Sequence, residues 1–359
     1  MKKGWKVFLC AVLAVVLLAL GYVAYVLIDY HRIGDQTLEL AQDGNTNAVQ
    51  IGTEYDMLSW NVGFGAYEAD YSFFMDGGTE SWAWSEERLN ANLANMAGEV
   101  AAQEADFCIL QEVDRNSTRS YHVDEYPVIG ASLLDGGFDS TFCCNYDSPF
   151  LMYPFTQPHG KSLSGLATFA NFDITAANRV SLPVEDSLMK LVDLDRCYAV
   201  NHIPTADGKE LVLYNVHLSA YTSDGTIAVE QLKLLLVDMQ SEAAKGNYVI
   251  CGGDFNKDLS GDCYTIFHQE KVEDSTWAQP LPEGIFDGTD LHLVVPLDEE
   301  HPVASCHTAS APYFEGQFVL TVDGFIVSDN VSVREATVVD TGYAYSDHNP
   351  IRMSFTLEG

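Results

Sequence analysis

The chain has 359 residues, of which 47% are hydrophobic and 11% aromatic, so it can bury a sizeable core and disorder is disfavoured. Its 52 acidic residues outnumber 18 basic ones and give a net charge of −34. Such a surface repels polyanions, and the basic footprint of a nucleic-acid binder is not visible in the sequence. The composition therefore disfavours duplex nucleic acid as a partner, but it does not specify a fold.

The N-terminal segment predicts a membrane-spanning helix. Residues 7–28 are uncharged and mostly apolar, and a helix of this length extends about 33 Å, enough to cross a bilayer core. Lys2, Lys3 and Lys6 precede it, which favours a cytoplasmic N-terminus and an extracytoplasmic remainder. A cleaved signal peptide and a buried helix of a soluble protein are the alternatives. The length of the run and the lack of a small-residue cleavage motif favour an uncleaved anchor.

Three parts are predicted along the chain. Residues 1–32 form a cytoplasmic stub and transmembrane anchor, residues 33–53 a polar tether, and residues 54–359 one folded domain. No later stretch resembles a linker or a repeat. Of the eight cysteines, Cys10 lies in the anchor, and no C-x-x-C motif occurs. This usage is not typical of a disulfide framework or a structural zinc site, although a single disulfide remains open.

Strand and helix signals alternate through the domain and predict an α/β fold. Apolar residues at helical spacing predict helices within residues 85–105 and 226–246, and Ser85 is a favourable N-cap for the first. Ligands of open α/β sheets bind where the strands end, so the residues at these ends matter most. Strands are predicted over residues 56–62, 106–112, 165–170, 211–218, 248–251, 320–327 and 351–357.

Polar residues end or flank six of these strands. Each alone has an ordinary structural explanation as a helix cap, a turn residue or a solvated group. The repetition of carboxylate, amide and imidazole side chains at strand ends is what favours a shared site. These residues are Asn61, Glu112, His217, Asp254, Asn256, Asp323, Asp347 and His348.

Together, these side chains predict a metal-dependent hydrolytic site. The carboxylate and amide oxygens are hard ligands of the kind that Mg²⁺ prefers. The two imidazoles can donate hydrogen bonds or transfer protons, and Asp323 can orient one of them. A metal ion beside such donors suits the attack of water on phosphorus, because it offsets charge on the phosphoryl oxygens.

The motifs "WN", "QE", "NVHL", "GGDFN", "VDGFIVS" and "SDHNP", in this order, resemble those of the endonuclease/exonuclease/phosphatase superfamily. That superfamily includes pancreatic-type deoxyribonucleases, apurinic endonucleases, inositol polyphosphate 5-phosphatases and neutral sphingomyelinases. The similarity spans residues 54–357. It implies a four-layered α/β sandwich, in which two packed mixed β-sheets are flanked by helices, here preceded by one transmembrane helix.

The resemblance also implies a metal site. Glu112 would be the principal Mg²⁺ ligand, with Asn61 beside it, and Mn²⁺ would be a possible substitute. Asp347 would supply a further carboxylate on the metal side or accept a hydrogen bond.

The resemblance implies the catalytic roles as well. Asp254 would polarise or deprotonate the attacking water, and Asn256 would hold a phosphoryl oxygen or a metal-bound water. His217 would contact the phosphate, and His348, oriented by Asp323, would be the second catalytic imidazole. Whether Asp254 or His348 acts as the base stays open.

Some residues lie outside these motifs. The segment of residues 63–84 is rich in aromatic and acidic residues, and long loops in compact domains are often functional. Trp82, Lys161 and Tyr221 are candidate substrate contacts. An aromatic loop folded onto the domain is an equally simple interpretation of Trp82, and a solvated side chain is the favoured interpretation of Lys161. Arg179 and Arg196 are predicted to be structural.

The sequence therefore predicts a membrane-anchored, Mg²⁺-dependent phosphoesterase at the cell membrane, with its domain extracytoplasmic. A phosphodiester or phosphomonoester of a small or lipid molecule is the expected substrate, as in a sphingomyelinase, a phospholipase C or an inositol phosphatase. An extracytoplasmic nuclease is the alternative. A non-catalytic surface-binding module is disfavoured, because every motif position holds a functional residue type. The oligomeric state is not predicted.

Overall fold

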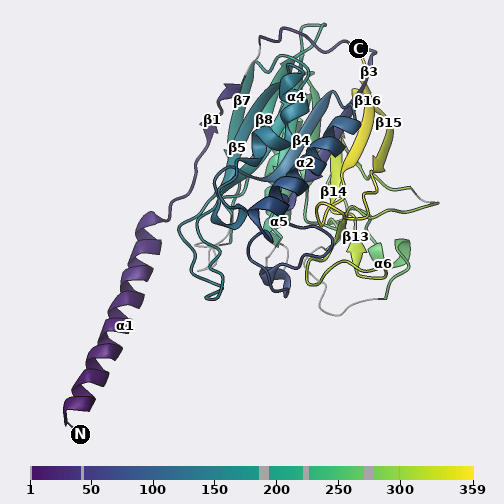
Figure 1. The fold of residues 1–359 in the computed structure, drawn as a ribbon. Helices are drawn as coiled ribbons and strands as arrows, with labels where there is room; N and C mark the ends of the chain where they lie inside the picture. The colour runs from purple at the N-terminus through teal and green to yellow at the C-terminus, as the bar shows by residue number, and fades with distance from the viewer. Residues whose placement is uncertain (1, 42–43, 186–193, 221–225, 271–278, 299) are drawn as a thin grey trace.

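The N-terminal helix α1 (Lys2–Asp29) extends away from the folded domain, and the C-terminus lies at the domain's opposite end (Figure 1). Within the residues that the structure describes, α1 alone is long and apolar enough to cross a membrane. The predicted apolar N-terminal helix is thus confirmed. The computed structural model describes residues 2–41, 44–185, 194–220, 226–270, 279–298 and 300–359.

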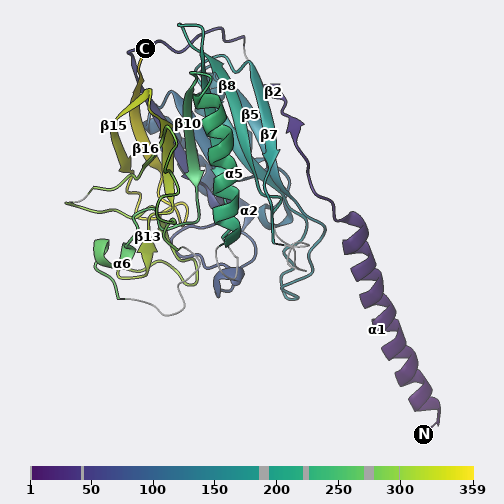
Figure 2. The same ribbon diagram turned by 180° about the vertical axis from the view of Figure 1, so that it is seen from behind.

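Two large mixed sheets pack face to face, and helices cover their outer faces (Figures 1 and 2). In the first sheet β9 and β10 are parallel neighbours, and the other described pairings are antiparallel. Its strands, in spatial order, are β1 (Gln36–Thr37), β7 (Ala176–Ser181), β8 (Cys197–Pro204), β9 (Glu210–His217), β10 (Tyr248–Asp254), β14 (Asp323–Ser328) and β11 (Leu291–Val294).

The second sheet has the same mixed character, with β3 and β4 as its parallel pair. Its strands, in spatial order, are β15 (Val331–Val338), β16 (Ile351–Leu357), β3 (Glu54–Asn61), β4 (Phe107–Asp114), β6 (Leu163–Ala170), β5 (Asp139–Asp147) and β2 (Leu40–Ala41). A separate small sheet pairs β12 (Cys306–His307) with β13 (Val319–Leu320).

The central strands are apolar on both faces because both faces are covered. Met57 on β3 and Ile109 on β4 point into the core between the sheets. Their sequence neighbours Leu58 and Leu110 point the other way, into the core beneath the helices. Successive strand residues face opposite sides, so two cores require continuous apolar runs of the kind that the sequence shows.

The two predicted helices form one outer layer each. α2 (Glu86–Ala102) begins at Ser85, whose hydroxyl accepts a hydrogen bond from the Arg88 amide at 3.1 Å. It covers the second sheet and is seen in front in Figure 1, whereas α5 (Thr226–Ala243) covers the first sheet and is in front in Figure 2. The short helices are α3 (Glu125–Ile129), α4 (Ala131–Asp135), α6 (Cys263–Ile266), η1 (Gly63–Gly65), η2 (Phe74–Asp76) and η3 (Thr118–Ser120).

All seven predicted strands and both predicted domain helices are confirmed, and the layers are those of the predicted four-layered α/β sandwich. The sequence missed β5, β7, β8 and β15. Residues 36–41, inside the predicted tether, pair with the edges of both sheets through β1 and β2. All eight cysteines are free thiols, although the sulfurs of Cys143 and Cys197 lie 3.5 Å apart in the core between the sheets.

Candidate active site

The sheet topology gathers the polar strand ends at one edge of the sandwich. Asp254, at the end of β10, pairs in register with His217 at the end of the parallel strand β9. It also pairs with Asp323, which begins the antiparallel strand β14. Because β16 runs antiparallel to β3, the segment before it returns beside Asn61, and the Ser346 hydroxyl donates to the Asn61 carbonyl at 2.8 Å. Both sheets therefore contribute to one cluster, here called the rim site.

Two backbone conformations direct side chains into the rim site. Gly253 has a φ of +144°, and a Cβ there would lie 2.0 Å from the Val216 carbonyl oxygen, so only glycine fits directly before Asp254. Glu112 has a φ of +57° and lies within the irregular part of the β4 register. Left-handed backbone at a non-glycine residue is uncommon and clusters at functional sites. A local break in the ladder also re-aims the side chain.

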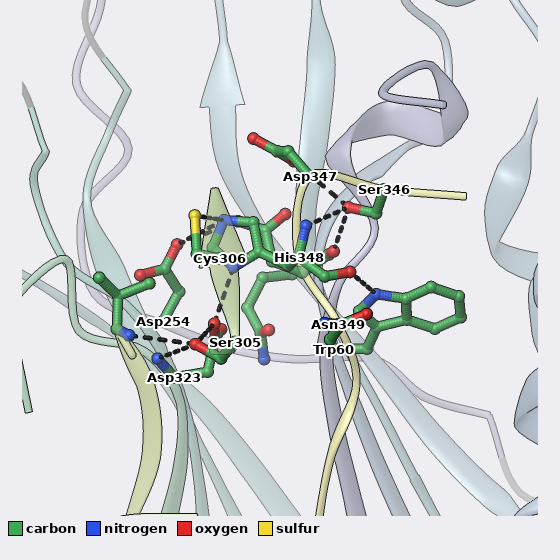
Figure 3. Close-up of polar contacts among 12 residues, drawn as sticks. Trp60, Asp254, Ser305, Cys306, Asp323, Ser346, Asp347, His348 and Asn349 are labelled. Atoms are coloured by element: carbon green, nitrogen blue, oxygen red, sulfur yellow. Dashed lines mark hydrogen bonds and ion pairs between the residues drawn. The ribbon is translucent and has the colours of Figure 1, made fainter. Parts of the chain in front are cut away.

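His348 is held by a buried carboxylate. Its Nδ1 lies 2.8 Å from Asp323 Oδ2, and the Ser305 hydroxyl donates to the same oxygen at 2.7 Å. The Asp323 amide donates back to Ser305 Oγ at 3.1 Å. Figure 3 shows these groups around the imidazole, with Cys306 Sγ 3.5 Å from Nε2. Asp323 and Ser305 therefore fix the ring and leave Nε2 facing Asp254.

Asp254 lies at the centre of the rim site. Its Oδ2 accepts a hydrogen bond from Asn61 Nδ2 at 3.0 Å and lies 3.6 Å from His217 Nε2 and 3.7 Å from His348 Nε2. Its Oδ1 accepts from the Asn256 amide at 2.8 Å. One carboxylate thus faces two imidazoles and an amide from three other elements.

Glu112 and Asp347 lie on the other side of Asn61. The Asn61 Nδ2 donates to Glu112 Oε1 at 3.1 Å as well as to Asp254, and its Oδ1 accepts from the Gly63 amide at 3.1 Å. Asp347 is half-buried, and its Oδ1 accepts from the Ser346 hydroxyl at 3.3 Å. These carboxylates are the groups that could hold a hard divalent cation.

The charge balance of the site fits such a cation. Burial raises the pKa of Asp347 to about 8; His348 opposes the shift, and Glu112 and Asp254 add to it. Burial likewise raises the pKa of Asp254 to about 7; the charge of His348 lowers this pKa, and the charge of Asp323 raises it further. Buried carboxylates that also face other carboxylates tend to retain protons unless a cation replaces those protons. The residues present therefore fit a divalent metal ion.

The two imidazoles differ in character. Burial opposes the charged form of His348, but Asp323, Cys306 and Asp347 outweigh it and hold the pKa of His348 well above its ordinary value. Burial lowers the pKa of His217 well below its ordinary value, and Arg196 and His348 lower it further. Burial and neighbouring charges therefore shift the pKa values of these two imidazoles in opposite directions, which favours the charged form of His348 and the neutral form of His217.

The structure brings eight predicted residues together at this edge, and Asn256 also fixes the backbone by donating from Nδ2 to the Leu218 carbonyl at 2.9 Å. Other candidates contact different parts of the domain. The Trp82 indole donates to the Pro158 carbonyl at 2.7 Å, and Lys161 lies 3.6 Å from Asp147. Tyr221 lies outside the described residues.

Sequence reasoning did not single out three neighbours of His348. Ser305 donates to Asp323, and Cys306 lies against the His348 ring. The Trp60 indole donates to the His348 carbonyl at 2.8 Å. Trp60 could have been found, because it directly precedes Asn61. Ser305 and Cys306 lie in a segment without strand or helix periodicity, so no local signal indicated that it returns to the site.

Comparison with known proteins agrees with this architecture. Residues 58–348 match the model of the Endonuclease/Exonuclease/phosphatase family. The comparison with curated protein sequences gives no match.

Solved structures share the fold at low sequence identity. An endonuclease/exonuclease/phosphatase from Beutenbergia cavernae DSM 12333 is 16% identical, with a TM-score of 0.55, over 85% of this chain and 72% of that one. ANGEL2, a 2′,3′-cyclic phosphatase, is 16% identical, with a TM-score of 0.54, and the match covers 90% of this chain and 99% of that one. The human Nocturnin catalytic domain with bound sulfate is 18% identical, with a TM-score of 0.52, over 89% and 97%.

Proposed function

Because this chain belongs to the endonuclease/exonuclease/phosphatase family, we propose that it is a metal-dependent phosphoesterase whose active site is the rim site. One observation carries the proposal. Asp254 Oδ2 lies within 3.0 Å of the Asn61 amide and 3.6 and 3.7 Å of two imidazoles, one of which is fixed by Asp323. This arrangement places a proton acceptor and donors to a developing oxyanion around one point.

The side chains divide the reaction among them. A water molecule attacks phosphorus, forming one P–O bond while the bond to the leaving oxygen breaks, and Asp254 accepts the proton of the water. His217 and His348 lie where their Nε2 atoms can donate to the phosphoryl oxygens as negative charge grows. Asp323 and Ser305 keep the His348 ring in place, and solvent protonates the leaving oxygen.

Glu112, Asp347 and Asn61 would hold the divalent ion. Mg²⁺ fits their oxygen donors, and Mn²⁺ is a possible substitute. When bound, such an ion supplies charge neutralisation at the phosphoryl oxygens and acidifies water. Glu112 and Asp347 would bind it directly, and Asn61 orients Glu112 through the 3.1 Å hydrogen bond.

The apolar helix α1 supports a location at a membrane. We propose that it is an uncleaved anchor with Lys2, Lys3 and Lys6 on the cytoplasmic side, so that the domain is extracytoplasmic at the cell membrane. The net charge of −34 favours a small or lipid phosphoester over duplex DNA. A nucleotide phosphoester is the second candidate, because a structural neighbour binds adenosine-2′,3′-vanadate.

The test is a substrate comparison on the full chain in lipid vesicles. Bis(p-nitrophenyl) phosphate, sphingomyelin, inositol phosphates and DNA are each offered with Mg²⁺, with EDTA, and with Mg²⁺ restored after EDTA. We expect hydrolysis of at least one small or lipid phosphoester, its loss in EDTA and its recovery with Mg²⁺. Hydrolysis that persists in EDTA would contradict the metal site, and cleavage of DNA alone would favour the second candidate, a nucleotide phosphoester.

A further inference from the structure

The loop between β5 and β6 exposes an unusual set of apolar side chains. Tyr153 is 64% exposed and Phe155 81%, and Phe150 and Met152 are also exposed. A soluble surface rarely clusters large apolar groups in this way without a partner. Residues 148–160, here called the 148–160 loop, therefore present a surface that requires an explanation.

Direct hydrogen bonds join this loop to the apolar helix. The Tyr22 hydroxyl donates to the Phe150 carbonyl at 3.1 Å and accepts from the Met152 amide at 3.0 Å. The Phe150 amide donates to the Tyr25 hydroxyl at 3.0 Å. Tyr22 precedes Asp29, the last helical residue, by about 10 Å along the axis. The loop thus lies beside the part of α1 that the proposed anchor places in the membrane.

Tyrosines at this position fit the interface of a bilayer. Tyr and Trp are enriched where the apolar core meets the headgroups, since they present an apolar ring and a polar atom. Amphipathic segments at an interface bury their apolar side to roughly 5–10 Å, which matches the depth of Tyr22 below the helix end. The exposed rings of Tyr153 and Phe155 would then lie in the same interfacial layer.

The 148–160 loop is also braced against the segment that follows the rim-site residue Asn61 in the chain. The Ser81 hydroxyl donates to the Gln157 carbonyl at 2.6 Å, and Phe74 packs on Tyr153 with ring centroids 5.8 Å apart. Both partners belong to the segment that follows Asn61 and Gly63. Figures 1 and 2 show the loops at this edge of the sheets extending on the side toward which α1 points, opposite the C-terminus.

We propose that the 148–160 loop inserts into the interface of the bilayer that α1 spans, and that it holds the rim site against the lipid headgroups. The inference rests on the proposed function for its consequence, that the substrate is a phosphoester presented by the membrane surface. Two attachment points, α1 and the loop, fix the orientation of the domain, whereas a single helix with a tether would let it rotate.

Brominated lipids test the insertion without any catalysis. The full chain is placed in phosphatidylcholine vesicles with brominated acyl chains, which quench tryptophan on contact. The Phe155→Trp variant is compared with Val237→Trp, because Val237 is 70% exposed on the outer face of α5. After subtraction of the native signal, we expect the tryptophan at 155 to be quenched and the tryptophan at 237 to remain bright. Equal emission from both would overturn the insertion.

A second comparison tests the consequence for the substrate. The double variant Tyr153→Ser/Phe155→Ser should lose hydrolysis of a vesicle-embedded phosphoester and keep that of soluble bis(p-nitrophenyl) phosphate, whereas the control Leu234→Ser should keep both. Equal loss on both substrates, or no loss on either, would overturn the positioning role. Quenching at residue 155 in a chain that hydrolyses nothing would instead refute the proposed function and leave the insertion standing.

Discussion

Two aspartates end parallel-paired strands in the two sheets, and their surroundings differ sharply. Asp114, the last residue of β4, accepts from Arg119 Nε at 3.0 Å and Nη2 at 2.9 Å, and from the Ser120 hydroxyl at 2.9 Å. Asp254, the last residue of β10, faces a neutral amide and two imidazoles. Both carboxylates are buried.

The comparison indicates that the partners of a buried carboxylate decide whether it stabilises the fold or takes part in a reaction. Arg119 is always charged, and its bidentate hydrogen bonds hold the Asp114 carboxylate in one fixed geometry. Asp254 has no such guanidinium partner among its described contacts, and burial raises its pKa to about 7. We propose that the first aspartate stabilises the fold, whereas the second accepts a proton in the reaction. The predictions below test this division.

Loss of the fixed imidazole should have the largest effect. His348→Gln removes the group held by Asp323, so we expect turnover of bis(p-nitrophenyl) phosphate to fall about 100- to 10,000-fold. His202→Gln is the control, because that histidine lies on β8 and pairs with Glu210 at 2.9 Å. Steady-state kinetics with Mg²⁺ measure both. Equal turnover in the two variants would remove His348 from the mechanism.

Asp114→Asn should act on stability rather than on chemistry. Breaking a buried ion pair leaves Arg119 without its counter-charge, at a cost of about 3–5 kcal/mol in the free energy of unfolding. Urea titration of the purified chain measures this loss. Turnover per folded molecule should change far less than in His348→Gln. A variant as stable as the unsubstituted chain would contradict the structural role of the pair.

Removal of the Ser305 hydroxyl, which donates to Asp323, should lower turnover less than the loss of His348 does. Ser305→Ala removes a 2.7 Å hydrogen bond to Asp323 and leaves two amides without their acceptor. A loss of about 1–3 kcal/mol corresponds to roughly a 5- to 150-fold fall in kcat, with KM unchanged. Ser305→Thr, which keeps the hydroxyl, should restore turnover. A fall in stability without any change in kcat would show that Ser305 does not position the site.

The surroundings of Asp114 also predict a pH dependence. Burial lowers the pKa of His159 to about 3, and Arg119 adds to the shift while Asp114 opposes it. The folded state thus keeps His159 neutral, whereas the unfolded chain binds a proton near pH 6.5. The contribution of neutral His159 to the free energy of unfolding is fully present above about pH 6.5 and decreases as the pH falls toward 3. At pH 5 the free energy of unfolding is lower by about 2 kcal/mol for this reason.

Urea titrations of the unsubstituted chain and His159→Gln at pH 7 and pH 5 isolate this contribution. The unsubstituted chain should lose more stability over that interval than the variant does. Parallel losses would mean that His159 carries a proton in the folded state.

The sequence predicted most of the interior strands and the polar residues at their ends, because buried strands have continuous apolar runs that end abruptly in polar residues. It missed β8, which lies between β7 and β9 in the first sheet. It missed β7 and β15, whose sequences "AANRVS" and "VSVREATV" are polar because these strands lie near or at sheet edges. It also missed Ser305. Ser305 reaches Asp323 because an irregular segment folds back to the site, and no local sequence pattern predicts where such a segment runs.

The central claim is that Asp254 accepts a proton in the reaction, whereas Asp114 stabilises the fold through its ion pair with Arg119. The most direct test measures turnover of bis(p-nitrophenyl) phosphate and the urea midpoint on the same sample of Asp254→Asn, with Mg²⁺ present. We predict a turnover about 100- to 10,000-fold below that of the unsubstituted chain, because the proton acceptor is gone, at a midpoint no lower than the original. Undiminished turnover, or a fall in turnover explained entirely by unfolding, would contradict the account.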